Sequence, residues 1–419
     1  MIVVVGAGIS GLTLAHELAA RGVEHVVLEA SARTGGVIRS GRVEGHLLEW
    51  GPQRARLTRD FERLVDDLSL RERLVEAPRD LPLFVYRRGR LRRVPFSASA
   101  FLTSDLLPLS AKLRVLAEPL TAGAKPGESV GGYFRRKLGR EAYESIAGPL
   151  YGGLYASDPD DMIVELSLGH VLREFDIERS LLLPLLRRGG RVTPPPACSF
   201  EDGLEELPRA LLACHRANVR LETPVRAIRR TRGGWTVETE RETIAASAVV
   251  VAVPARAAGA MLAEASPAAA ARISGLAYNP LAVVHVHAQT QLRGLGYQVS
   301  LAESMVTRGV TFNDSLFERR GVYTIYLGGA KNRWVAEAAD DELVRIALDE
   351  FRVATGAEAR VLSVAREWMP AWDRSWAAIS GMELPADVHV HANWHARPGL
   401  PGRLAGSRRL AERLAAEAS

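Results

Sequence analysis

The stretch Ile2-Val3-Val4-Val5-Gly6-Ala7-Gly8-Ile9-Ser10-Gly11 decides the fold of this chain. It starts with four consecutive apolar residues, which predict a short buried strand, and continues with three spaced glycines. From Ser10 to Arg21 apolar residues recur at helical spacing, Gly22 stops that pattern, and residues 23–29 are typical of a second strand. A strand, a helix and a further strand in this order predict a βαβ unit that opens an α/β domain.

The spaced glycines predict a phosphate-binding turn. The first glycine permits a tight turn, the second lets backbone approach a pyrophosphate, and the third lets the helix pack closely on the strand. The helix that follows directs its unpaired N–H groups and its positive dipole end at the phosphates. The residues predicted to hold the phosphates are Gly6, Gly8, Ile9, Ser10 and Gly11.

An acidic residue ends the second predicted strand, as a dinucleotide site requires. Glu29 follows Gly11 by 18 residues, and its carboxylate can accept hydrogen bonds from both ribose hydroxyls. Its negative charge also disfavours a 2′-phosphate, which argues against NADP. The adjoining Ala30 is included in the predicted site.

The next segment indicates FAD rather than NAD. An arginine followed by two glycines, in Arg33-Thr34-Gly35-Gly36, can wrap the far side of the pyrophosphate by charge and close backbone approach. A Gly-Pro turn follows after a further strand-like stretch. The cofactor residues predicted in this region are Arg33, Gly35, Gly36, Val37, Gly51, Pro52 and Gln53.

Two of these motifs resemble the amine oxidase–like flavoprotein superfamily: Glu-x-x-x-Arg-x-Gly-Gly at 29–36 and Glu-x-Gly-Pro at 49–52. Later segments resemble the protoporphyrinogen/coproporphyrinogen oxidase family within it. They are residues 148–159, with Tyr-Ala-Ser-Asp where the family has Tyr-Ala-Gly-Asp, residues 199–208, and residues 278–284 with the shorter motifs at 294–296 and 326–332. The resemblance follows the family's order over nearly the whole chain. It implies an α/β fold with a discontinuous, Rossmann-type FAD-binding domain, a mixed-sheet substrate domain and a helical insertion.

The resemblance also assigns cofactor residues in the second half of the chain. Val225 would meet the adenine through its backbone, and the segment leading into the last helix, including Pro398, Gly399 and Leu400, would lie along the flavin. The family usually has Gly-Val where this chain has Arg397-Pro398. Pro398 has no N–H to donate to the flavin, whereas Arg397 would place a positive charge beside the reduced ring.

The chain is expected to divide into three parts. The FAD-binding domain is predicted from residues 1–58, 200–272 and 384–419, the substrate domain from 59–84 and 273–383, and the helical insertion, with a part that can face a membrane, from 85–199. No cysteine follows Cys214, so FAD is expected to be bound non-covalently.

The resemblance implies an FAD-dependent oxidoreductase of haem biosynthesis. It would convert protoporphyrinogen IX or coproporphyrinogen III to the porphyrin, with O2 reduced to H2O2, and the sequence leaves open which tetrapyrrole is the substrate. The chemistry would be flavin-centred, and no residue is assigned as a general base because pyrrole nitrogens can release protons to solvent. The alternatives are another FAD amine oxidase, a polyene desaturase, or a non-catalytic flavin- or porphyrin-binding protein.

Cations that could bind substrate carboxylates cluster after the predicted strand at 84–86. Family members tend to carry an arginine just before that strand, where this chain has Leu83. Five arginines follow closely, and they either pair with propionate groups or form a solvated basic hairpin: Arg87, Arg88, Arg90, Arg92 and Arg93.

Composition narrows the expected partners. The net charge of +5 is mild for 419 residues and the arginines are scattered, so no nucleic-acid partner is expected. His285, His287, His389 and His391 alternate on two strands without an evident third ligand, so no metal is expected. Without a charged leader or an apolar run of ~18 residues, a cytoplasmic location is expected, and residues 180–188 could contact the inner membrane face peripherally. The oligomeric state stays open.

Overall fold

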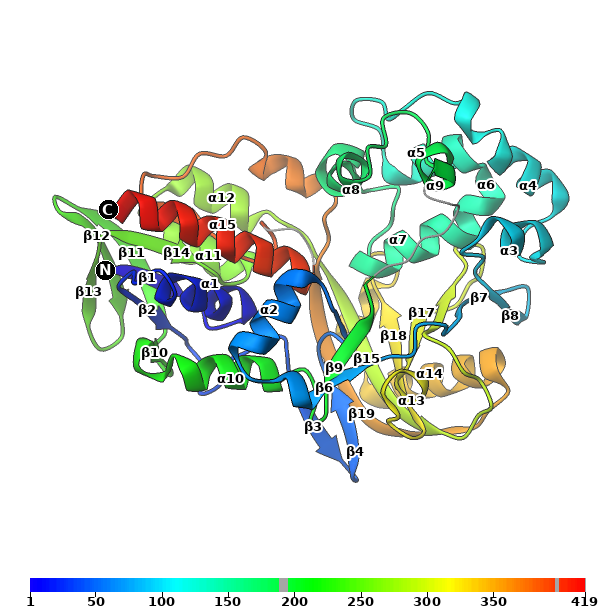
Figure 1. Ribbon diagram of the computed structural model, residues 1–419, viewed down its shortest axis with the longest axis horizontal. Coiled ribbons are helices and arrows are strands. Elements are labelled where there is room, and N and C mark those ends of the chain that lie inside the picture. Colours follow the sequence, from blue (N-terminus) through cyan, green and yellow to red (C-terminus); the bar gives the residue numbers. More distant parts are fainter. Residues whose placement is uncertain (188–194, 396–398, 419) are drawn as a thin grey trace.

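The computed structural model describes residues 1–187, 195–395 and 399–418. Figure 1 shows a parallel-sheet unit that holds both chain ends, a mixed-sheet unit beside it, and a group of helices above the mixed sheet. The chain passes between the two units several times, so each is assembled from distant segments.

The parallel-sheet unit is organised around five short strands. Their order across the sheet is β10 (Val219–Arg220), β2 (His25–Leu28), β1 (Ile2–Val5), β14 (Ala248–Val251) and β20 (Val388–Val390), and every pair is parallel. Strands covered on both faces are apolar throughout. In β1, Ile2 and Val4 join one buried cluster, while Val3 and Val5 join another on the opposite face.

Each face of this sheet has its own cover. On the Ile2 side pack α1 (Ile9–Ala19), α2 (Arg59–Asp67), α10 (Glu206–Cys214) and α15 (Leu400–Ala418). On the other side pack α11 (Ala255–Leu262), α12 (Pro267–Ser274) and the antiparallel sheet of β11 (Val225–Thr231), β12 (Gly234–Thr239) and β13 (Thr243–Ala246). The sequence predicted that residues 59–84 belong to the substrate domain. In the structure α2 packs on α15, because Phe61, Leu64 and Val65 are buried in the parallel-sheet unit.

The mixed-sheet unit contains seven strands. Their order is β19 (Ala359–Pro370), β15 (Tyr278–Ala288), β18 (Val322–Gly328), β17 (Thr307–Phe312), β16 (Gly296–Val299), β7 (Leu83–Arg87) and β8 (Arg90–Arg93). One face is covered by α14 (Asp340–Thr355), whose Leu343, Ala347 and Phe351 recur every four residues and form one apolar stripe. The short α13 (Asn313–Phe317) links β17 to β18.

Short elements join the two units. They are the hairpin of β3 (Ser40–Val43) with β4 (His46–Glu49) and the small sheet of β5 (Ala55–Arg56), β9 (Ala197–Phe200) and β6 (Leu74–Glu76). Phe200 belongs to the core of the parallel-sheet unit, whereas Ala197 packs with Leu316 of the mixed-sheet unit. The strand β9 therefore contributes to both units.

The hairpin at 83–93 belongs to the mixed sheet. The sequence predicted the helical insertion to begin at residue 85, but β7 pairs in parallel with β16, more than two hundred residues further along the chain. Val85 on β7 is fully buried between the sheet and the insertion. The insertion therefore begins after Arg93.

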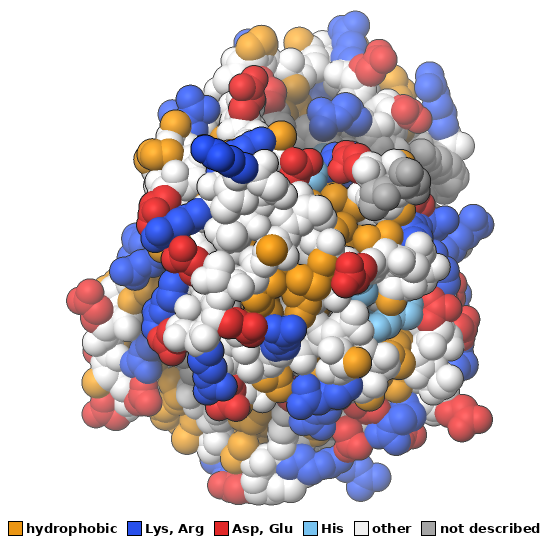
Figure 2. All heavy atoms as spheres, turned by 90° about the vertical axis from the view of Figure 1, so that its left-hand side faces the viewer, with side chains coloured by type: hydrophobic (Ala, Val, Ile, Leu, Met, Phe, Trp, Pro, Cys, Tyr) orange, Lys and Arg blue, Asp and Glu red, His pale blue; other side chains and the backbone are white. Residues whose placement is uncertain are grey.

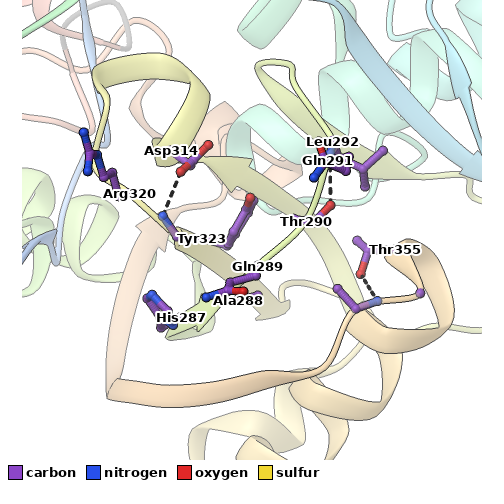
Figure 3. A pocket seen from close by; sticks show the side chains of 13 residues that line it. His287, Ala288, Gln289, Thr290, Gln291, Leu292, Asp314, Arg320, Tyr323 and Thr355 are labelled. Atoms are coloured by element: carbon purple, nitrogen blue, oxygen red, sulfur yellow. Dashed lines mark hydrogen bonds between the residues drawn. The ribbon is translucent and has the colours of Figure 1, made fainter.

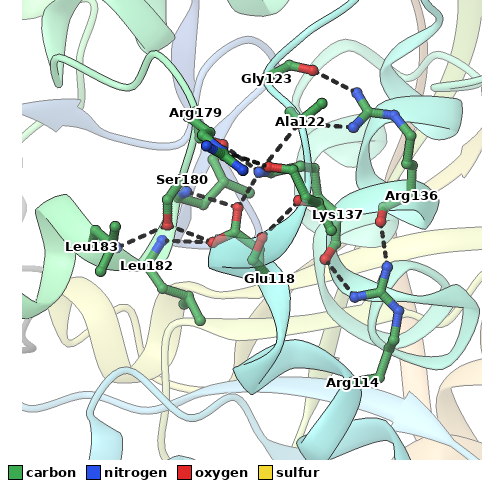
Figure 4. A network of polar contacts seen from close by, with 12 residues as sticks. Arg114, Glu118, Ala122, Gly123, Arg136, Lys137, Arg179, Ser180, Leu182 and Leu183 are labelled. Atoms are coloured by element: carbon green, nitrogen blue, oxygen red, sulfur yellow. Dashed lines mark hydrogen bonds and ion pairs between the residues drawn. The ribbon is translucent and has the colours of Figure 1, made fainter.

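The helical insertion is built from short helices above the mixed sheet (Figure 1). They are α3 (Ala98–Thr103), α4 (Leu109–Leu116), α5 (Val130–Leu138), α6 (Arg140–Ala142), α7 (Gly148–Tyr155), α8 (Gly169–Glu174) and α9 (Leu182–Arg187). Glu118 and Lys137 form an ion pair in which both side chains are fully buried. Figure 4 shows how this pair ties α5 to the 179–183 segment, since the Ser180 hydroxyl and the N–H groups of Leu181 and Leu182 also donate to Glu118.

The surface carries charges of both signs. On the face seen in Figure 2, lysine and arginine side chains are interspersed with aspartate and glutamate. Among the described residues, no helix is both long and apolar enough to cross a membrane.

Candidate functional site

The turn between β1 and α1 exposes backbone of the kind that binds anions. Gly6 has a φ of +105°, which favours glycine. A Cβ at Gly11 would lie 1.9 Å from the carbonyl oxygen of Gly6, so only glycine lets α1 approach β1 so closely. Gly8 precedes α1 and provides no side-chain cap, and Ile9 and Ser10 form its first turn, where N–H groups have no partner within the helix. This geometry suits a phosphate.

Glu29 follows β2 and connects the glycine turn to the next loop. One carboxylate oxygen accepts the N–H of Ala7 at 2.8 Å, and the other accepts the N–H and the hydroxyl of Ser31 at 2.9 and 2.8 Å. Because the residue is only half-buried, its remaining lone pairs can accept ribose hydroxyls.

The start of β11 reaches the same loop. The N–H of Thr223 donates to the carbonyl of Glu29, and the N–H of Glu222 donates to the carbonyl of Ser31. Val225 therefore lies buried beside the end of β2, while Ala30 is exposed on the loop. This arrangement brings the predicted adenine-side and ribose-side residues together.

The loop at 33–38 folds back over the glycine turn. The N–H of Gly35 donates to the carbonyl of Ala7 at 2.9 Å, and a bridge pairs Gly8 with Gly35. A Cβ on Gly36 would lie 3.3 Å from the Cα of Gly8. Two stretches of backbone without side chains thus meet here, and they fit the pyrophosphate of a dinucleotide.

Arg33 gives this loop a positive charge and also stabilises it by hydrogen bonds. Its guanidinium donates to three carbonyl groups of the loop at 2.6 to 3.3 Å, and neighbouring Val37 is 54% exposed. Glu367 on β19 faces the same loop: burial raises its pKa, and the charges of Arg39 and Arg33 act against that rise. Glu367, which no sequence motif marks, brings the mixed sheet to the cofactor segment.

The Gly51-Pro52-Gln53 turn is packed against the same segment. A Cβ on Gly51 would lie 1.9 Å from the carbonyl oxygen of Val37. The Gln53 amide donates to the carbonyls of Glu49 and Gly51 at 2.7 and 3.1 Å, and its oxygen accepts from Asn313 and Thr324, both at 2.9 Å. The side chain of Gln53 therefore braces the turn, and its backbone is what the turn can offer to a cofactor.

A buried carboxylate supports this turn from behind. Glu49 accepts hydrogen bonds from Ser40, from the N–H of Leu204 and, at 2.9 Å, from Arg319. Burial raises its pKa, although the charge of Arg319 acts to lower it. Arg319 also donates to the Ser199 hydroxyl at 3.0 Å, so the Leu204 N–H and Arg319 together join the Glu-x-Gly-Pro and Ser-Phe-Glu-Asp-Gly-Leu motifs, which spacing along the chain could not reveal.

Arg54, directly after the braced turn, is a cation that the sequence analysis missed. Its pKa is lowered to about 10, chiefly by burial and also by the charge of the nearby Arg56, while Tyr326 acts in the opposite direction. Burial raises the pKa of Tyr326 to about 12. Both side chains keep some accessible surface, and Arg54 has no hydrogen bond or ion pair with any described residue. Both side chains therefore lie where the turn at 51–53 meets β18 of the mixed sheet.

The segment before α15 is held by buried polar side chains. Arg403 donates to the carbonyls of Ala392 and Asn393 at 2.6 and 3.0 Å, and burial lowers its pKa to about 10. Trp394 is fully buried and donates to the carbonyl of Val253 at 2.9 Å. Gly399 has a φ of +82° and Leu400 begins α15.

Two of the predicted cofactor residues, Arg397 and Pro398, lie outside the described residues.

The arginines of the 83–93 hairpin are mostly used within the fold. Arg87 is buried and pairs with Glu141, while Arg90 and Arg92 both pair with Asp105. The remaining two, Arg88 and Arg93, are exposed. Carboxylate binding by Arg87, Arg90 and Arg92 is therefore disfavoured, because acidic partners from the chain already occupy them.

Two further features lie away from the glycine turn. A surface depression of about 890 Å³ beyond the end of β15 is lined by polar side chains such as Gln289, Thr290 and Asp314, as Figure 3 shows, and by none of the predicted cofactor residues.

Two of the histidines that alternate on strands have partners within the chain: His285 hydrogen-bonds to the carbonyl of Glu49, and His391 hydrogen-bonds to the hydroxyl of Ser407. In the described part of the chain, no three His, Cys, Asp or Glu residues gather as metal ligands would.

The chain was compared with known proteins. The model of the flavin-containing amine oxidoreductase family matches residues 9–398. Protoporphyrinogen oxidase of Oryza sativa subsp. japonica is 30% identical (82% of this chain, 72% of that protein), and coproporphyrinogen III oxidase of Bacillus subtilis is 24% identical (84% and 82%). A crystal structure from Exiguobacterium sp. 255-15, provisionally assigned as a protoporphyrinogen oxidase, is 22% identical with a TM-score of 0.79 (99% and 98%) and supports the fold. The chain therefore belongs to the flavin-containing amine oxidoreductases, within the protoporphyrinogen/coproporphyrinogen oxidase family, and is an FAD-dependent oxidoreductase.

Proposed function

We propose that this protein oxidises a porphyrinogen, protoporphyrinogen IX or coproporphyrinogen III, to the porphyrin in haem biosynthesis. The reaction removes six electrons and six protons from the substrate and reduces three O2 to three H2O2. Bound FAD would supply the hydride acceptor for the methylene bridges and then pass the electrons to O2.

The observation that carries the proposal is the unpaired guanidinium of Arg54. It lies near Tyr326, where the cofactor segment meets the mixed sheet, and a largely buried charge without an anion is costly. A porphyrinogen carries carboxylates that would compensate this charge. An amine substrate would be repelled by it, and a polyene would offer it no partner.

Different groups of residues position the cofactor and the substrate-binding arginine. The glycine turn and Glu29 hold the adenosine and pyrophosphate parts of FAD, and the network of Gln53 fixes the loop that presents Arg54. Arg403 fixes the chain that leads toward the flavin end of the site. No general base is assigned.

The test is to purify the protein, record its visible spectrum and mix it aerobically with each porphyrinogen. Flavin absorbance together with porphyrin fluorescence that grows faster than autoxidation would support the proposal. Flavin without porphyrin formation would contradict it, and turnover of an amine or a polyene would then identify the alternative.

We further propose a cytoplasmic protein with peripheral membrane contact through the insertion. Support comes from exposed leucines on and after α4: Leu109 (72% exposed), Leu113 (59%) and Leu120 (82%). Residues 180–188, from which contact was expected, are described only as far as residue 187, and Leu183 is 43% exposed. Co-sedimentation with anionic vesicles that is unaffected by Leu109→Ser and Leu113→Ser would contradict this contact.

A further inference from the structure

Arg308 lies at an irregularity in β17. Thr307 opposes Leu327 of β18 and Gly309 opposes Tyr326, so Arg308 is an extra residue between two successive partners. Such a bulge re-aims a side chain relative to the regular strand. Thr307 is buried, whereas Arg308 is half-buried and lines a cavity.

The cavity has a volume of about 190 Å³ and lies between the connection from β16 to β17 and the residues that follow β18. Its polar lining includes Ser300, Ser304, Arg308, Lys331 and Asn332. Pockets for whole ligands span roughly 300–1,000 Å³, and one water occupies about 30 Å³. The cavity therefore has room for one substituent of a larger molecule, with some water, but not for a tetrapyrrole ring.

Arg308 is the free cation among the described residues of this lining. Lys331 is paired with Asp158 at 3.3 Å, and the acidic Glu303 accepts the N–H of Arg88 at 2.7 Å. Arg308 has no hydrogen bond or ion pair with a described residue, and its Nε is buried without a partner. Burial lowers its pKa, while Asp158 acts to raise it. A guanidinium presents paired donors that match a carboxylate.

We infer that Arg308 binds a peripheral carboxylate of the substrate in this cavity and thereby selects a substrate with carboxylates on more than one edge. The inference rests on the proposed function. Arg54 lies near Tyr326 on the side of the cofactor segment, whereas Arg308 lies at the bulge of β17 that faces the step from Tyr326 to Leu327 on β18. The two propionates of protoporphyrinogen IX share one edge of the ring, whereas coproporphyrinogen III carries one propionate on each of its four pyrroles, so two separate cations fit coproporphyrinogen III better.

The experiment compares the binding of coproporphyrin III and protoporphyrin IX to the flavin-loaded protein by fluorescence titration. The variants are Arg308→Gln, the charge-retaining Arg308→Lys, and Arg232→Gln as a matched control. Arg232 is exposed in the turn between β11 and β12, far from the cavity along the chain, and its loss changes the net charge equally.

The wild type should bind coproporphyrin III more tightly than protoporphyrin IX. Arg308→Gln should weaken coproporphyrin binding about 10- to 100-fold, the loss expected for a charge-assisted hydrogen-bonded pair, and weaken protoporphyrin binding much less. Arg308→Lys should fall between, and Arg232→Gln should match the wild type.

Three outcomes would overturn the inference. Arg308→Gln could lose affinity equally for both porphyrins, it could lose no affinity, or the wild type could bind neither porphyrin. Selective, Arg308-dependent binding without any porphyrinogen oxidation would preserve the carboxylate pocket and overturn only the oxidase proposal. The two failures are therefore distinguishable.

Discussion

The buried Glu118–Lys137 pair should make the helical insertion highly sensitive to the loss of either charge. Both side chains are 0% exposed, and Lys137→Met would leave the carboxylate with hydrogen bonds from Ser180, Leu181 and Leu182 but without a cation. Removing one partner of a buried pair typically costs about 3–5 kcal/mol. Replacing both partners, in Glu118→Gln with Lys137→Met, removes both charges and should cost much less than the sum of the single changes.

Hydrogen exchange is the appropriate assay, because a chain of several units need not unfold in one step. The reporters are the α5 amides, such as Tyr133, which donates to the Ser129 carbonyl at 2.8 Å, and α1 provides an internal reference. A local loss of about 3–5 kcal/mol lowers protection by roughly two to four orders of magnitude in each single variant. The double variant should recover most of that protection.

A surface pair provides the matched control. Arg140 pairs with Glu144 on consecutive turns, and its side chain is 81% exposed. Water and salt screen such a pair, so Arg140→Gln should leave α5 protection unchanged. If the two single losses at Glu118 and Lys137 simply add in the double variant, the reasoning that each charge compensates the other is refuted.

Three further predictions concern the cofactor site and acid sensitivity. Glu29→Ala removes the acceptor for the Ala7 N–H and for the ribose, and the purified variant should lose most of its flavin absorbance relative to its protein absorbance; a fully yellow variant would show that the ribose site is elsewhere. Gly11→Ala places a Cβ 1.9 Å from the carbonyl oxygen of Gly6, so it should lower both the melting temperature and the flavin content, and unchanged values would contradict the close contact. Burial alone would raise the pKa of Glu118, but hydrogen bonds, first that from Lys137, lower this pKa below the ordinary 4.5. The stability that the Glu118 carboxylate contributes is therefore complete above pH 4.5 and is lost as the pH falls through the lower native pKa. The excess α5 protection of the wild type over Glu118→Gln should therefore shrink in acid, and a constant difference would refute this linkage.

Much of the secondary structure could be predicted from local sequence patterns. The βαβ unit could be read from residues 2–29 because a strand with both faces covered is uniformly apolar and the helix after it has a helical period. The helix α14 is also defined by local sequence, since its apolar stripe determines the buried face and the glycine after it determines the end.

Domain boundaries were less predictable, because a boundary depends on which partner an apolar face meets. The face formed by Phe61, Leu64 and Val65 would suit any core, and only the fold places it against α15. Likewise, β7 looks like an ordinary half-buried strand, and its parallel pairing with β16 is set by contacts across more than two hundred residues.

The cofactor residues and the substrate cations differ in how visible they are in the sequence. A phosphate turn is defined by local backbone conformation, so its glycines stand at fixed spacing. An arginine can bind the substrate's carboxylate only if no acidic residue of the folded chain pairs with it. The spacing of residues along the sequence does not show which acidic residues come close. The hairpin arginines were conspicuous as a run, yet Arg87, Arg90 and Arg92 meet acidic partners from the same chain.

Neither Arg54 nor Arg308 forms a hydrogen bond or an ion pair with a described residue. A buried guanidinium without a partner destabilises a protein unless something outside the chain compensates it. A substrate that brings carboxylates to both arginines would explain why the protein retains two such charges. The cost of keeping them unpaired in the free protein then becomes part of the driving force for binding an anionic substrate.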